Sequence, residues 1–149
     1  MSTRCVCGMI KRKCIDEDLL KRIIAEFFLP ENEIVVEKNE KYTTYEGIRA
    51  EDKVTISFVY EKRPPYNVYD SNIMNDEFKY AQLILFDIEK EEASVDRYKE
   101  AINFYIYLKQ KIDSDVLVTS DVHDDICLLR RKEIIWSEDL YEDKFELSK

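Results

Sequence analysis

The strand-like segments between the two helical stretches of this chain follow one another too closely for helices to connect them. Residues 53–62, KVTISFVYEK, show the clearest strand pattern. Apolar side chains at Val54, Ile56, Phe58 and Tyr60 alternate with those of Thr55, Ser57, Val59 and Glu61. Parallel neighbours need a crossover of a dozen or more residues, whereas antiparallel neighbours need only a short turn. The sequence therefore predicts an α+β fold: a mainly antiparallel sheet with helices on one face.

The remaining segments complete this prediction as a single domain over residues 1–149. Helices are expected at residues 16–29, capped by Asp16 and stopped by Pro30, and at residues 94–112, capped by Ser94. The predicted order is β-α-β-β-β-β-α-β-β, with about six to eight strands. Strands are expected at 3–10, 33–38, 42–50, 53–62, 80–88, 115–119 and 125–136, the last of which holds one or two strands. Residues 63–78 are expected to form a long ordered loop, and residues 137–149 an acidic tail that is a possible frayed helix.

Charge and glycine content exclude several classes of function. The net charge of −9 and the sequence pI of about 4.8 argue against a nucleic-acid ligand, because phosphate binding needs clustered Lys and Arg. With only two glycines, the chain has no GxGxxG or GxxxxGK[ST] phosphate loop. No apolar run is long enough for a membrane span, and the first residues do not form a signal peptide, so a cytoplasmic protein is expected.

Three of the four cysteines lie near the start of the chain. Cys5, Cys7 and Cys14 have the spacing C-x-C-x6-C, which is not a common zinc pattern. The favoured interpretation is that they are free thiols in a reducing compartment, with Cys5 and Cys7 on one face of a strand. The alternative is a metal site made by these three cysteines with Cys127 or His123.

The turn predicted at residues 120–125 contains the only histidine. Asp121, His123, Asp124 and Asp125 are residue types that bind divalent ions, but local Asp runs also make good turns, and the EF-hand glycine is absent. The chain also has no GxSxG nucleophile motif. We therefore expect no catalytic residues, no metal and no cofactor. The alternative is a small soluble enzyme or metal-binding protein that uses this turn or the N-terminal cysteines.

Acidic residues gather late in the chain. Residues 113–125 contain five Asp and no Lys or Arg, and residues 137–149 contain five acids and two Lys. One interpretation is an ordinary solvated surface, and the other is a surface that binds a protein partner. The candidate partner-binding residues are Asp115, Asp121, His123, Asp124, Asp125, Trp136, Glu138 and Asp139.

Three stretches resemble the SitI-type immunity proteins of bacterial polymorphic-toxin systems. They are DEDLLKRIIAEF, AQLILFDIEKE followed by RYKEAINFYIYLKQK, and the closing DSDVLVTSDVHDDICLLRRKEIIW. The chain departs from the family at its last turn, where RRKE replaces the usual glycines. The resemblance implies a non-catalytic protein that binds and blocks a cognate toxin protein. It implies no catalytic residues, and it leaves the toxin and the oligomeric state open.

Overall fold

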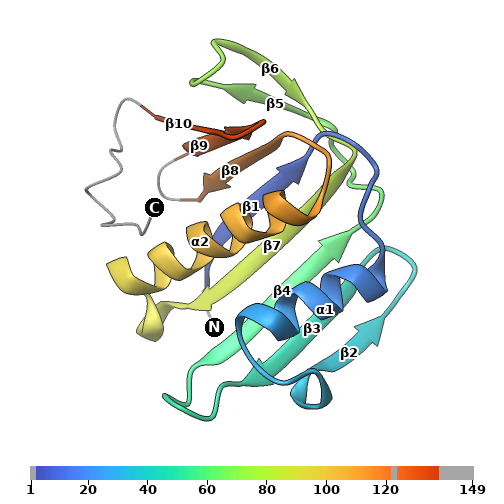
Figure 1. The fold of residues 1–149 in the computed structure, drawn as a ribbon, viewed down its shortest axis with the longest axis vertical. Helices are drawn as coiled ribbons and strands as arrows, with labels where there is room; N and C mark the ends of the chain where they lie inside the picture. Colours follow the sequence, from blue (N-terminus) through green and yellow to red (C-terminus); the bar gives the residue numbers. More distant parts are fainter. Residues whose placement is uncertain (1–2, 122–123, 138–149) are drawn as a thin grey trace.

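The computed structural model describes residues 3–121 and 124–137 (Figure 1). These residues form two α-helices and ten β-strands, with short 3-10 turns at Glu31–Glu33 and Lys90–Glu92. In chain order the elements are β1 (Thr3–Ile10), α1 (Glu17–Phe27), β2 (Val35–Lys38), β3 (Thr43–Ile48), β4 (Thr55–Glu61), β5 (Val68–Ser71), β6 (Asp76–Lys79), β7 (Gln82–Glu89), α2 (Val95–Lys111), β8 (Val116–Ser120), β9 (Asp124–Arg130) and β10 (Glu133–Trp136).

Eight of the strands form one antiparallel sheet. Their order is β10-β9-β8-β1-β7-β4-β3-β2, so the N-terminal strand lies in the middle and pairs with β7 on one side and β8 on the other. Both helices cover the same face of this sheet (Figure 1). The predicted fold class, α+β with a mainly antiparallel sheet and two helices, is confirmed. Neither described helix is long and apolar enough to cross a membrane.

The helices begin where their capping residues predict. The Asp16 side chain accepts a hydrogen bond from the Leu19 backbone N–H at 2.7 Å, and the Ser94 hydroxyl accepts one from that of Arg97. These contacts satisfy amide groups that have no partner inside a first helical turn. Each helix then buries one apolar stripe against the sheet, including Leu20, Ile23 and Ile24 of α1 and Ala101, Ile102, Phe104, Tyr105 and Leu108 of α2.

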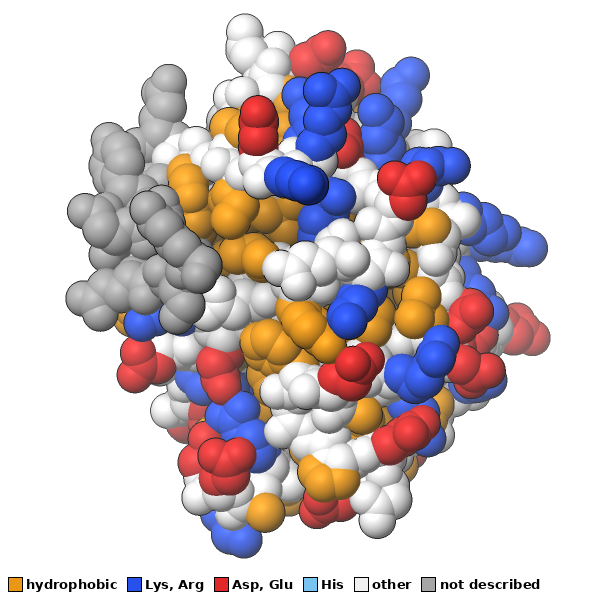
Figure 2. Space-filling view, viewed as in Figure 1, with side chains coloured by type: hydrophobic (Ala, Val, Ile, Leu, Met, Phe, Trp, Pro, Cys, Tyr) orange, Lys and Arg blue, Asp and Glu red, His pale blue; other side chains and the backbone are white. Residues whose placement is uncertain are grey.

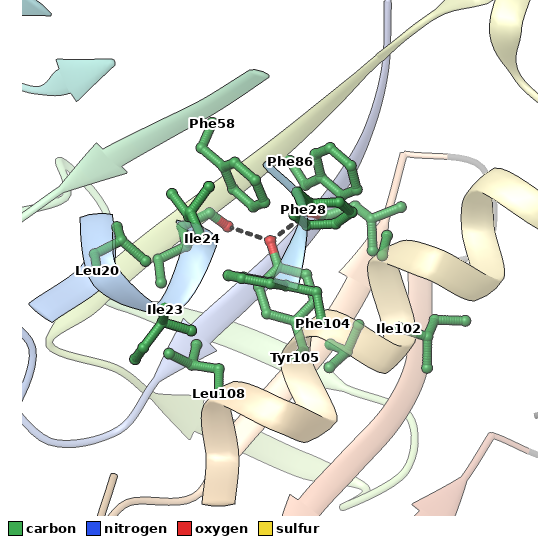
Figure 3. Close-up of a cluster of buried hydrophobic side chains, with 14 of the residues drawn as sticks. Leu20, Ile23, Ile24, Phe28, Phe58, Phe86, Ile102, Phe104, Tyr105 and Leu108 are labelled. Carbon is green, nitrogen blue, oxygen red and sulfur yellow. Dashed lines mark hydrogen bonds between the residues drawn. The ribbon is translucent and has the colours of Figure 1, made fainter. Parts of the chain in front are cut away.

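Aromatic rings fill the space between the helices and the sheet (Figure 3). The Phe104 ring lies 4.7 Å from that of Phe58 and 5.6 Å from that of Phe28, measured between centroids. The Tyr105 hydroxyl lies 2.7 Å from the Val6 carbonyl oxygen and 3.1 Å from that of Ile84, so it donates to the backbones of β1 and β7. This contact joins α2 to the two central strands of the sheet.

The loop prediction for residues 63–78 is wrong, because this segment contains the hairpin of β5 and β6. The hairpin packs on the sheet face that the helices leave free, where Phe78 joins a second apolar cluster with Met9, Leu117 and Leu128. Each of its strands buries only one residue, Ser71 in β5 and Phe78 in β6. Strands that bury so little show no alternation of apolar and polar residues, so the pattern could not reveal them.

Two further differences concern the strand connections. Six strands, β2 to β7, lie between the helices, whereas the sequence predicted four. The last turn, which lacks the glycine typical of such turns, places Arg131 in the left-handed region with a φ of 54°. A non-glycine residue is uncommon in this conformation.

Candidate partner-binding face

The side of the sheet opposite the helices is only partly covered by the hairpin. Successive residues of a strand point to opposite faces, so residues in register on neighbouring strands share a face. One such row crosses six adjacent positions of the sheet, which we call the acidic row: Asp121, Cys5, Asp87, Ser57, Glu46 and Val35. Asp121, Glu46 and Val35 are exposed, and the three residues between Asp121 and Glu46 are half-buried.

Asp87 lies between the two other carboxylates of the acidic row. Neighbouring strands lie about 4.8 Å apart, so Asp87 lies about 10 Å from both Asp121 and Glu46 along the row. Burial raises the pKa of Asp87, and the negative charges of Asp121 and Glu46 raise it further, while the neighbouring Cys5 thiol opposes the shift. The middle of this face is therefore partly desolvated and lies in a negative field.

Exposed apolar side chains lie beside these acids. Val35 and Ile48 are 61% and 60% exposed, although each stands in a strand of the main sheet. Val35 is part of the acidic row, and Ile48 lies on the same side of β3 as Glu46. On the helix-covered face, by contrast, acidic and basic side chains are interspersed, and hydrophobic side chains are visible between α1 and α2 (Figure 2).

The cysteines do not assemble into one site. Cys5 and Cys7 share a face of β1 as predicted, and their sulfur atoms lie 3.4 Å apart. Cys14 lies beyond the far end of β1, where its backbone N–H donates to Gln82, and Cys127 is buried in the core on the helix side. All four cysteines are free thiols in the structure. Within residues 3–121 and 124–137, no three His, Cys, Asp or Glu side chains are grouped as metal ligands.

The predicted partner-binding residues are dispersed in the structure. Asp115 and Asp121 lie at opposite ends of β8, about 20 Å apart at ~3.3 Å per residue. Asp115 is half-buried beside Arg130, and the half-buried Trp136 packs against the helix-side core. The structure places only the backbone of Asp124, in β9. His123, Glu138 and Asp139 lie outside the described residues.

Asp125 requires a correction, because it was expected at the surface and is only 1% exposed. Its carboxylate accepts hydrogen bonds from the Ser71 hydroxyl at 2.6 Å and from the Ile73 backbone N–H at 3.1 Å. Both donors belong to the segment of the β5–β6 hairpin. Asp125 therefore anchors the hairpin to β9, and its carboxylate is not available to a partner.

Sequence reasoning did not identify Asp87 or Glu46 as site residues. Each is an acid within a strand, and a single acid in a strand is ordinary on a solvated face. One feature of the sequence could have identified Asp87. It lies in the run LILFDI, where a charged residue interrupts an otherwise apolar strand. Only the register across β1, β7, β4 and β3 shows that these acids share one row.

A separate cavity of about 560 Å³ lies where the end of β4, the β2–β3 turn and the start of α1 meet. Glu17 lies in its wall and forms ion pairs with Lys38 and Lys62. Contact with Lys38, and then with Lys62, lowers the pKa of Glu17 to about 2. The cavity lining also carries Glu40, Lys41, Tyr42, Glu61 and Arg63, so positive and negative charges are mixed in it.

We expect the Glu17 ion pairs to make folding pH-dependent. A carboxyl group whose pKa is lower in the folded chain than its ordinary 4.5 stabilises the fold above pH 4.5, and this contribution is lost as pH falls towards 2. In urea titrations, Glu17→Gln should therefore reduce the decline in unfolding free energy between about pH 4.5 and 2. Asp18→Asn removes an exposed carboxylate from the same helical turn and is the matched control. An unchanged slope in Glu17→Gln would contradict the expectation.

Comparisons with protein-family models, curated proteins and solved structures find no match for the chain.

Proposed function

We propose that this chain is an immunity protein that binds and neutralises a cognate bacterial toxin through the face that carries the acidic row. The observation that carries the proposal is the placement of Glu46, Asp87 and Asp121 in one cross-strand row on a partly open sheet face. The three acids come from segments far apart in the sequence, and the fold brings them together. The resemblance of the chain to SitI-type proteins supports the same function.

The charge of the face favours a basic partner. The chain has a net charge of −9, so its field attracts cationic surfaces over distances comparable to the Debye length, about 8 Å at physiological salt. Complementary charge speeds the encounter of two proteins and disfavours partners of like charge. The toxin that we propose is therefore a protein with a cationic surface around the region to be blocked.

The apolar part of the face supports a protein rather than a small ion as the ligand. Val35 and Ile48 offer exposed aliphatic surface next to Glu46, and protein interfaces combine an apolar centre with polar and charged groups. Such a face would hold a toxin by excluding water from these side chains while the acids orient the partner. Neutralisation is then occlusion of the toxin, in the cytoplasm of the cell that makes both proteins.

The alternative of an enzyme or metal-binding protein gains no support from the described residues. It would use the N-terminal cysteines or the turn from Asp121 to Asp125. Cys14 lies apart from the Cys5–Cys7 pair, and the Asp125 carboxylate is hydrogen-bonded to the hairpin.

The proposal is tested by producing the chain together with the product of the neighbouring gene. We expect the neighbouring gene product to arrest growth when expressed alone, and the chain to restore growth and to co-purify with it at one to one. Continued arrest in the presence of folded chain, or restored growth without a complex, would contradict the proposal. The Asp125→Asn variant, altered at the hairpin rather than in the acidic row, should still protect where it remains folded.

A further inference from the structure

Cys5, which lies in the acidic row, and Cys7 form a pair of half-buried thiols to which the proposed function assigns no chemistry. Their sulfur atoms are 3.4 Å apart on the partly open side of β1. Asp87 of β7 lies in register with Cys5, and Thr119 of β8 lies in register with Cys7. Two thiols held in contact, with polar groups on both sides, can act together on one ligand.

A direct disulfide between these residues is disfavoured by the sheet. Residues two apart in a strand are separated by about 6.6 Å at both Cα and Cβ, whereas a disulfide needs Cβ atoms about 3.5–4.5 Å apart. Closing the bond would bend β1, which is paired along its length with β7 and over five residues with β8. An atom that bridges the two sulfurs removes this requirement, because the sulfurs can remain at van der Waals distance.

The sulfur separation also selects the kind of bridging atom. An atom bonded to both sulfurs at about 2.3 Å, the length of a zinc–thiolate bond, would subtend an angle of about 95° across 3.4 Å. Linear two-coordinate soft cations would need sulfurs about 4.6 Å apart at the same bond length. Zinc needs four ligands, and no third protein ligand joins the pair in the described part of the chain. A pyramidal trivalent centre with bond angles near a right angle fits the pair.

We propose that Cys5 and Cys7 form a dithiol site for trivalent arsenic compounds, with one arsenic atom bonded to both sulfurs. For an arsenic(III) oxide R–As=O, two As–S bonds form and the As=O bond breaks. The oxide oxygen takes both thiol protons and leaves as water, so no atom changes its oxidation state. The hydrogen bond from Cys5 lowers the pKa of Cys7, so Cys7 is the first nucleophile. Asp87, in register with Cys5, is placed to pass the Cys5 proton to the leaving oxygen when the second bond forms.

Phenylarsine oxide is a suitable probe, read by the intact mass of the reduced, folded protein. We expect one adduct per chain, with the mass of the oxide less one water. It should persist in excess glutathione, a monothiol, and be removed by a dithiol such as 2,3-dimercaptopropanol. Cys5→Ser and Cys7→Ser should each weaken binding by more than about tenfold, because the second bond is intramolecular only when both thiols are present.

Cys14→Ser is the matched control, since it removes a half-buried thiol beyond the far end of β1. It should bind the probe as the unaltered chain does. Circular dichroism of each variant establishes that a loss of binding is not a loss of folding, and Cys7→Ala provides a second variant if Cys7→Ser does not fold. Unaltered binding by Cys5→Ser, loss of binding in Cys14→Ser, or the absence of a monothiol-resistant adduct on the unaltered chain would overturn the proposal.

Discussion

Replacing Phe104 with alanine is expected to lower the free energy of unfolding by about 3–5 kcal/mol, the usual cost of removing a buried ring. The Phe104 side chain is fully buried at the centre of the aromatic cluster, where it contacts rings from α1, β4 and its own helix. Its removal leaves a cavity between the helices and the sheet that the surrounding rings fill only in part. Urea unfolding followed by circular dichroism measures the loss.

Asn103→Ala is the control for this substitution, because Asn103 is the preceding residue of α2 and is only half-buried. We expect Asn103→Ala to change the free energy of unfolding by less than about 1 kcal/mol. If Phe104→Ala is too unstable to purify, Phe104→Leu should show a smaller loss of the same sign. A Phe104→Ala protein within about 1 kcal/mol of the unaltered chain would contradict the packing of α2 on the sheet.

Gln82→Leu is expected to cost about 3 kcal/mol, although it replaces a polar residue with an apolar one of similar size. The Gln82 amide is buried and makes four hydrogen bonds. Its oxygen accepts from the backbone N–H groups of Cys14 and Ile15, and its nitrogen donates to the Ile15 carbonyl oxygen and the Tyr60 hydroxyl. Leucine would leave the backbone N–H groups of Cys14 and Ile15 without the Gln82 oxygen, whereas the Ile15 carbonyl oxygen still accepts from the Tyr60 hydroxyl. Each unsatisfied buried donor costs about 1–3 kcal/mol.

The same change at Gln110 provides the comparison, because that side chain is exposed near the end of α2. Gln110→Leu should alter the free energy of unfolding by less than about 0.5 kcal/mol. The difference between the two variants measures how strongly Gln82 ties the segment before α1 to β7 and β4. Equal effects would show that this segment is held by other contacts.

Local patterns in the sequence were sufficient to predict the features that depend on residues close together in the chain. Asp16 and Ser94 cap the helices because a cap is a contact over three residues, and the strict alternation of residues 55–61 corresponds to β4. The shared face of Cys5 and Cys7 follows from the two-residue period of a strand. These features can be predicted without knowing which elements pack together.

The failures concern contacts between distant segments. Asp125 was assigned to an exposed turn, because its Ser71 partner is 54 residues away and belongs to a hairpin that the pattern did not show. The acidic row combines residues of β2, β3, β4, β7 and β1 with Asp121, which follows β8. Their alignment depends on a strand order in which β1 lies between β7 and β8. Periodicity indicates which face of a strand is buried, but it does not indicate which strands pair.

The most direct test of the proposed function is the rate at which the chain associates with its partner. The product of the neighbouring gene serves as the partner, and Glu46→Lys is compared with Glu51→Lys. Both variants change the net charge equally, but Glu46 belongs to the acidic row, whereas Glu51 is exposed on the β3–β4 turn. We predict that Glu46→Lys slows association by about tenfold at low salt and weakens its dependence on salt, because exposed charges act mainly on the association rate. Glu51→Lys should change the rate much less. Equal association rates for the two variants would contradict binding through the acidic row.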